Sequence, residues 1–285
     1  MKRGIFCLLT CVISTIIPLY LSGAVRYHCN SDYQGVEKLM QAAAGEENYG
    51  KRIVKAARSM VGVPLGKAAD NDTVGTIIIR LDTLSQREFI NYALAAAKAA
   101  MAVNPDKSDF EKALESVSRK KGTDNGFVSQ FFYGSDWIQD NISRGNLKEM
   151  TDYLDGGSFK TKSLDYVTRH RDEFPAMADS ATYEKMRAIE MGFRSHRIPH
   201  QKKQSIGNKS VVELLKDGDI IIMLPPEDDF DIYDIGIVAM DSGQPRLIHV
   251  SRQNGKVVED EYDLKRLFKI EGQFFYGYRW LRPTE

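Results

Sequence analysis

The chain has 285 residues, with 39 basic and 39 acidic side chains and a formal net charge of zero. Apart from short basic patches such as Lys202 and Lys203 it has no extended lysine-rich or arginine-rich block. Binding to nucleic acid needs a concentrated positive surface, so composition excludes that class of partner. A hydrophobic content of 42% is enough for a full core.

Residues 1–24 have the composition of a secretory signal peptide. A basic start is followed by an apolar run over residues 5–21 and by small residues that end at Ala24. We expect cleavage near Ala24, which leaves residues 25–285 as one exported domain, periplasmic or extracellular, without a stable membrane span. An uncleaved anchor is the less favoured alternative, because Pro18 interrupts a run of marginal length.

The cysteines argue against a disulfide framework and against a cysteine-rich metal site. Of three in the chain, Cys7 and Cys11 lie in the predicted signal peptide, and Cys29 lies close to the expected new terminus. Catalysis needs a nucleophile held in a fixed geometry, which a chain terminus rarely supplies. We interpret Cys29 as an unpaired or incidental thiol, and pairing with another chain stays open.

The first part of the domain is predicted to be helical. Apolar residues recur with helical spacing over residues 35–61, which indicates two helices. The β-branched stretch 76–81 predicts a short buried strand, and the alanine-rich stretch 85–102 predicts a strongly amphipathic helix. A further helix is expected over residues 109–117.

The rest of the chain divides into an irregular middle and a β-rich end. The middle is predicted to hold an aromatic-rich stretch at 127–138, loop and short helix at 141–157, a helix at 183–191 between breaks at 174–175 and 198–199, and an exposed loop at 201–209. The strands are predicted at 219–223, 234–240, 246–250, 256–259 and 277–281. Helices followed by an antiparallel sheet predict a single α+β domain with an elaborated middle segment.

Common catalytic and metal-binding motifs are not found. The chain has no G-x-S-x-G elbow and no H-E-x-x-H motif. His196 and His200 are separated by Pro199, so we interpret them as surface histidines on a loop and expect no metal and no cofactor. The acidic stretch 228–234 lacks the glycine and glutamate of an EF-hand, which favours a solvated loop over a calcium site.

Several segments nevertheless occur together in a recognisable order. They are AARSMVGVP at 56–64, the D-W-I and D-N residues at 136–141, TRHRDEFP at 168–175, GDIII at 218–222, DIYDIGIV at 231–238, IHVS at 248–251, and the closing stretch 277–282. In this order the chain resembles the NlpC/p60 branch of the N-acetylmuramoyl-L-alanine amidase-like proteins. The resemblance implies a papain-like scaffold, in which N-terminal helices pack on a C-terminal antiparallel sheet.

The resemblance also implies which residues stand at the catalytic positions. Members of the family cleave the amide between muramic acid and the first L-alanine of peptidoglycan, with a cysteine at a helix start and a histidine on a strand. Here Gln86 stands at the cysteine position, Asp234 at the histidine position, and Phe132 at a polar pocket position. An amide side chain cannot form the acyl intermediate. His249 is retained in the L-H-A-S position, and Ser85 is the alternative nucleophile.

We therefore expect a bacterial cell-envelope protein that is a pseudoenzyme. It would bind a muropeptide or an envelope protein without cutting it, with ligand contacts from Phe132, Tyr133, Trp137 and His249. One alternative is an active amidase with a relocated constellation of Ser85, Asp234 and His249. The other is a purely structural envelope protein, in which aromatic side chains such as Phe132 fill the cleft.

Overall fold

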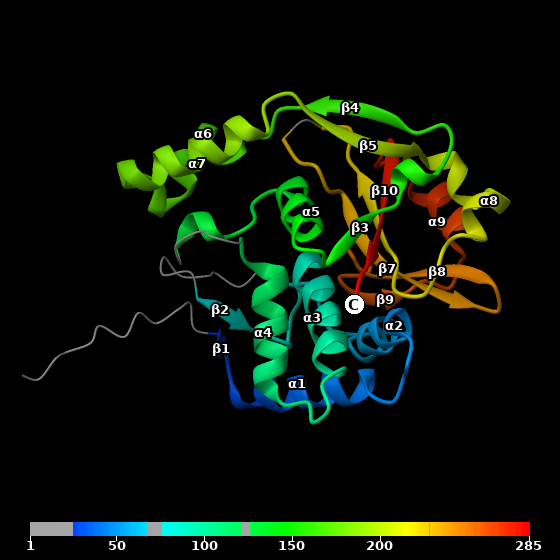
Figure 1. Cartoon of the computed structure of the whole chain (residues 1–285). Helices are drawn as coiled ribbons and strands as arrows, with labels where there is room; N and C mark the ends of the chain where they lie inside the picture. Colours follow the sequence, from blue (N-terminus) through cyan, green and yellow to red (C-terminus); the bar gives the residue numbers. More distant parts are fainter. Residues whose placement is uncertain (1–24, 68–75, 121–125, 228) are drawn as a thin grey trace, which may run out of the picture.

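The structure is a computed structural model that describes residues 25–67, 76–120, 126–227 and 229–285 (Figure 1). The predicted signal peptide, residues 1–24, lies outside the described residues. Within the part of the chain that is described, none of the helices combines the length and the apolar character that crossing a bilayer requires.

The N-terminal half forms a layer of helices. It contains β1 Val25–Tyr27, α1 Asn30–Ala43, α2 Tyr49–Ser59, β2 Ile77–Ile79, α3 Gln86–Ala99 and α4 Lys107–Ser118. The predicted helices are confirmed, although α1 begins earlier than expected, at Asn30. Helix α3 is buried on nearly all sides, and its many alanines let α2 and α4 pack closely against it.

The C-terminal half forms an eight-stranded sheet in which every pair of strands is antiparallel. Its strands are β3 Leu147–Glu149, β4 Ser158–Lys162, β5 His196–Lys202, β6 Ile220–Leu224, β7 Asp234–Asp241, β8 Gln244–Ser251, β9 Lys256–Glu259 and β10 Gly277–Pro283. The order is β4-β5-β10-β6-β7-β8-β9, and β3 pairs with β10. The fold is therefore α+β, with the helices first and the antiparallel sheet after them.

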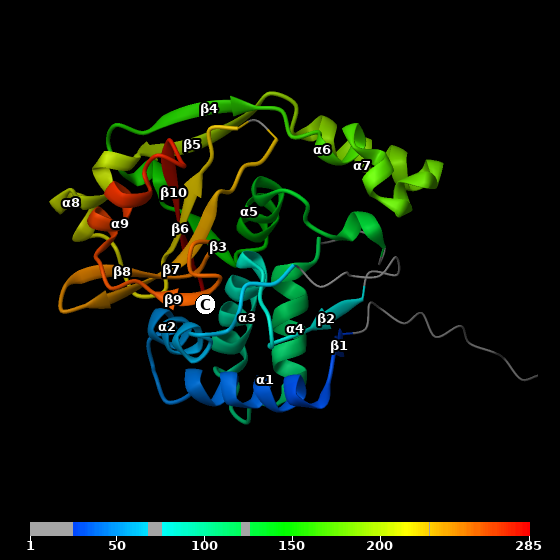
Figure 2. The ribbon, with the colours of Figure 1, turned by 180° about the vertical axis from the view of Figure 1, so that it is seen from behind.

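Alternation of side chains along the central strands gives the sheet two apolar faces. On one face Ile220, Ile222 and Ile237 belong to the core that the N-terminal helices share, where α2 and α3 contact β7. On the other face lies a second core that includes Trp280. Two helices cover it, α8 Lys209–Val212 and α9 Leu264–Glu271. Figure 2 shows the same arrangement from behind.

The middle segment builds a third, smaller core. Helix α5, Gly134–Ser143, lies between the helical layer and the sheet, while α6 Tyr166–Arg169 and α7 Ser180–Gly192 lie together at the end of the β4–β5 arm (Figure 1). Short 3-10 turns at 127–129, 151–153, 171–173, 175–178 and 203–207 connect these elements.

The predicted break at Pro199 and the exposed loop that begins at Gln201 are wrong. Both residues belong to β5, where Pro199 stands opposite Phe159 of β4. Gln201 is 2% exposed, and its amide donates to the carbonyls of Thr151 and Leu154. A proline is compatible with a strand where its missing N–H is not needed for pairing. Elements β1, β3, β4, α5, α6, α8 and α9 were not predicted.

Candidate functional site

The start of α3 is fixed by a capping box. The backbone N–H of Ser85 donates to Glu88 Oε2 at 2.9 Å, and the backbone N–H of Glu88 donates to Ser85 Oγ at 3.3 Å. Reciprocal bonds of this kind satisfy donors that the first helical turn leaves unpaired. Gln86 is consequently the first residue of the helix, and its half-buried side chain reaches β7.

The structure brings Gln86, Asp234 and His249 into direct contact. Gln86 Nε2 donates to Asp234 Oδ1 at 2.7 Å, and His249 Nδ1 lies 2.6 Å from Asp234 Oδ2. Asp234 begins β7, and His249 lies on β8 opposite Gly236. The two side chains are therefore diagonal neighbours on adjacent strands, a spacing within reach of an imidazole.

The carboxylate of Asp234 is almost fully occupied. Besides Gln86 and His249 it accepts a third bond, from the backbone N–H of Ile235 to Oδ1 at 2.7 Å. A carboxylate has about four acceptor positions, and Asp234 is only 2% exposed. It is held as an acceptor for its neighbours.

His249 is enclosed between two carboxylates. Its Nε2 lies 3.4 Å from Asp260 Oδ2, close enough for an ion pair although the groups are not aligned for a hydrogen bond. Burial lowers the pKa of His249, but the charges of Asp234 and Asp260 and the hydrogen bond with Asp234 outweigh it and raise the pKa to about 10. At neutral pH the side chain is an imidazolium, which cannot act as a general base.

A further acidic residue, Glu271, lies close enough to be affected by the charge of Asp234. Burial, together with the charge of Asp234, raises the pKa of Glu271, and the charge of His249 opposes that rise. The polar group around Gln86 thus contains three carboxyl groups and one buried cation. Sequence reasoning missed Asp260 and Glu271, because neither lies in a motif and only the fold brings them to His249.

An exposed aromatic surface lies next to Gln86. The carbonyl of Tyr233 is 3.5 Å from Gln86 Nε2, and the Tyr233 ring stacks on Phe274 with 5.5 Å between centroids and 14° between planes. Phe274 is 47% exposed, and the guanidinium of Arg252 lies 5.2 Å from the centre of the Tyr233 ring. A flat aromatic pair with a cation beside it is a surface on which a ligand can stack.

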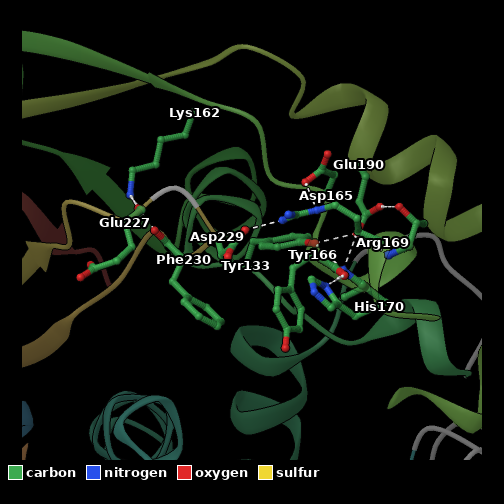
Figure 3. A network of polar contacts seen from close by, with 12 residues as sticks. Tyr133, Lys162, Asp165, Tyr166, Arg169, His170, Glu190, Glu227, Asp229 and Phe230 are labelled. Atoms are coloured by element: carbon green, nitrogen blue, oxygen red, sulfur yellow. Dashed lines mark hydrogen bonds and ion pairs between the residues drawn. The ribbon is translucent and has the colours of Figure 1, made fainter. Parts of the chain in front are cut away.

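A polar network holds the loop that leads into β7 (Figure 3). The ammonium of Lys162, on β4, donates to the carbonyls of Pro225, Glu227 and Phe230. Arg169 pairs with Asp229 of the same loop. The loop is therefore tied to the arm formed by β4, β5, α6 and α7 only a few residues before Asp234.

The side chains expected to contact a ligand are largely interior. Trp137 is 1% exposed and its indole N–H donates to the carbonyl of Val117, while Tyr133 is 3% exposed and its hydroxyl donates to Glu190 (Figure 3). Both are core residues whose polar atoms are already bonded, and ligand contact from them stays a prediction. Phe132 is half-buried and packs against Phe127 at 4.6 Å between centroids.

Neither Ser85, the alternative nucleophile, nor Cys29 is hydrogen-bonded to the imidazole among the described residues. The hydroxyl of Ser85 donates to Glu88 Oε2 at 2.6 Å, and within the described ranges Ser85 has no hydrogen bond to Asp234 or His249. Cys29 lies at the start of α1, where its Sγ donates to Asp32 Oδ2 at 2.9 Å. Both residues serve as helix caps in this structure.

The structure contradicts the interpretation of the two histidines, His196 and His200, and part of the interpretation of the acidic stretch. His196 and His200 are not surface histidines on a loop; both lie on β5, and His200 is only 9% exposed. The acidic stretch is not wholly solvated either. Asp231 is 5% exposed and accepts from the backbone N–H groups of Gly134 and Ser135, which caps the start of α5.

Comparison with known proteins identifies the family of the chain and proteins with a similar fold. A model of the N-acetylmuramoyl-L-alanine amidase-like family, AmiA-like, matches residues 63–270, well over half of the chain. No curated protein sequence matches the chain.

Solved structures show the same fold. An N-acetylmuramoyl-L-alanine amidase from Bacteroides uniformis has a TM-score of 0.72 at 22% identity, over 83% of this chain and 99% of that one. A Bacteroides fragilis protein provisionally described as a xylanase has a TM-score of 0.68 at 24% identity, over 79% and 98%. A Legionella pneumophila protein from a domain family of unknown function has a TM-score of 0.66 at 15% identity, over 90% and 94%.

Proposed function

The chain belongs to the N-acetylmuramoyl-L-alanine amidase-like family, and on this basis we propose that it is an exported cell-envelope protein that binds muropeptides without cleaving them. The proposal includes a papain-like scaffold of the NlpC/p60 type, a signal peptide removed near Ala24, and a periplasmic or extracellular location. One observation carries the loss of cleavage: the side chain at the start of α3 is an amide that is hydrogen-bonded to a carboxylate, Gln86 to Asp234 at 2.7 Å.

The chemistry of amide cleavage supports this proposal. A covalent mechanism needs a nucleophile and a neutral base beside it. Gln86 cannot attack a carbonyl, Asp234 accepts three hydrogen bonds, and His249 is an imidazolium at neutral pH. Gln86 and His249 are thus both hydrogen-bonded to Asp234, and neither is free to take part in amide cleavage.

Ligand binding is supported by the surface beside these residues. Phe274 and Tyr233 present a stacked aromatic pair, and Arg252 adds a positive charge suited to the carboxylates of a peptidoglycan stem peptide. Because the Tyr233 carbonyl lies 3.5 Å from Gln86, a muropeptide on this surface would contact the former catalytic position.

The decisive experiment measures cleavage and binding separately. The purified protein is incubated with N-acetylmuramoyl-L-alanine peptides, and release of the free amine is followed by mass spectrometry. We expect no turnover, together with a dissociation constant measurable by calorimetry. Phe274→Ala should weaken binding about tenfold, as expected for loss of one stacking side chain. Phe159→Ala is the matched control, because Phe159 is similarly exposed, at 50%, on β4.

Two results would favour the other candidates. Turnover that disappears in Ser85→Ala, with labelling of Ser85 by a fluorophosphonate probe, would establish an active hydrolase with a relocated nucleophile. Failure of every muropeptide to bind or to shift the melting temperature would favour a structural envelope protein.

A further inference from the structure

A small cavity lies on the side of α3 that faces β2 and α4. It has a volume of about 110 Å³, and Gln86 is not among the residues that line it. Since a water molecule occupies about 30 Å³ in the liquid, the cavity has room for about three or four waters or for one small organic molecule. Its polar lining includes Ser85, Arg87, Glu88, Asn91, Arg119 and Gln130.

Arg87 lines this cavity without a partner of its own. Across the described ranges its guanidinium makes no hydrogen bond and no ion pair, although Asp231, Glu88 and Asp136 are near enough to influence its charge. The side chain is partly exposed, so a small ligand in the cavity can reach its guanidinium. Arginine stays protonated in proteins and is a strong donor to a carboxylate.

Asn91 is the second group that lacks a partner. It lies one helical turn from Arg87, is 6% exposed, and its Oδ1 has no hydrogen-bond partner among the described residues. A buried amide oxygen of this kind needs a donor, and an unmet one costs about 1–3 kcal/mol. Arg119, 7% exposed and bonded through Nη1 to Ser129 Oγ at 3.0 Å, adds a second positive charge to the wall.

We propose that this cavity binds a small carboxylate that also carries an N–H donor. The carboxylate accepts from Arg87 and Arg119, and the N–H donates to Asn91 Oδ1. Arg87 and Arg119 place two guanidinium groups in the described lining, and a guanidinium is the side-chain group best suited to a carboxylate. A free α-amino acid and an N-acylated one share this chemistry.

The site does not depend on the proposed function. It lies on the face of α3 that packs toward α4, whereas Gln86 points to β7. Failure of muropeptide binding would leave this cavity and its unpaired groups unchanged, and an empty cavity would leave the proposal about Gln86 and Asp234 unchanged.

The test is isothermal titration of the full-length mature protein with four probes. These are L-alanine, N-acetyl-L-alanine, propionate and L-alaninamide. We expect the first two to bind, and the tighter of them identifies the source of the ligand. Propionate should bind about tenfold more weakly because it lacks the N–H, and L-alaninamide should not bind because it lacks the carboxylate.

Variants then assign the contacts. Arg87→Gln should weaken L-alanine binding by about tenfold or more, and Asn91→Leu should weaken L-alanine without weakening propionate. Lys98→Gln is the matched control, because it removes a positive charge from an exposed position of the same helix. Affinity unchanged in Arg87→Gln overturns the proposal.

A second measurement needs no variant and remains decisive if a variant fails to fold. Crystals of the unmodified protein are soaked with L-alanine and with N-acetyl-L-alanine. Density for either molecule between Arg87 and Asn91 supports the assignment. A cavity that holds only water at saturating ligand, with no heat of binding for any probe, overturns it.

Discussion

Raising the pH from 6.5 to 10.5 should destabilise this protein through one residue, His249. Its pKa is about 10 in the folded protein and about 6.5 in an unfolded chain. A group whose pKa is raised by folding contributes its full stability below the unfolded pKa and loses it as the pH rises through the folded one. The facing groups are Asp234, Asp260 and Glu271, all carboxyl groups that favour the cation.

The magnitude follows from the difference between the two pKa values. At about 1.4 kcal/mol per pKa unit, a rise of about 3 to 4 units corresponds to at most about 4 to 5 kcal/mol of unfolding free energy. That is a large part of the stability of a typical domain. The loss should begin above pH 6.5 and be nearly complete by about pH 10.5.

Urea denaturation at a series of pH values measures the loss, with His249→Gln as the control. Tyrosine and lysine side chains also titrate near pH 10, so the informative quantity is the difference between the two proteins. The stability of wild type should fall more steeply with pH than that of His249→Gln. An NMR titration of the His249 ring with a midpoint near 6.5, or identical pH dependence in both proteins, would refute the reasoning.

Three further predictions concern packing and capping. Trp137→Ala should lower the unfolding free energy by about 3–5 kcal/mol in urea denaturation, because it empties a fully buried site; a loss below 1 kcal/mol would contradict its place in the core. Ser85→Ala should cost about 1 kcal/mol by the same assay through loss of a helix cap, with muropeptide affinity unchanged. Lys162→Met should speed proteolytic cleavage of the segment 225–230, because Lys162 binds the carbonyls of Pro225, Glu227 and Phe230. Lys160→Met removes a single contact, to the Pro226 carbonyl, and should have a smaller effect.

Sequence periodicity was sufficient for the helices around Ala56 and Leu114, which bury one face. The helix around Phe89 and the strand around Ile237 are buried on nearly every side, and their nearly continuous apolar runs match that burial. The β4–β5 arm escaped prediction because its residues are polar and Pro199 signals a break. Only pairing across long stretches of chain makes His196–Lys202 a strand.

The candidate site could be predicted in part from the sequence. Gln86, Asp234 and His249 could be selected by position in motifs, and the fold brings them within hydrogen-bonding distance. The positive charge of His249 could not be predicted from the sequence, since it depends on Asp260 from a separate segment. Tertiary contacts, and not local sequence, set the charge state of a buried imidazole.

On the proposed function, the contacts among these three residues also argue that neither Gln86→Cys nor Asp234→His alone would give amide cleavage. A cysteine in place of Gln86 would face the carboxylate of Asp234, and a neighbouring negative charge disfavours the thiolate that must attack. A histidine in place of Asp234 would face the His249 imidazole without the carboxylate that now holds its proton, leaving Gln86 without its acceptor. Each residue is suited to the other two as they stand, so we expect hydrolysis only where Gln86 and Asp234 change together.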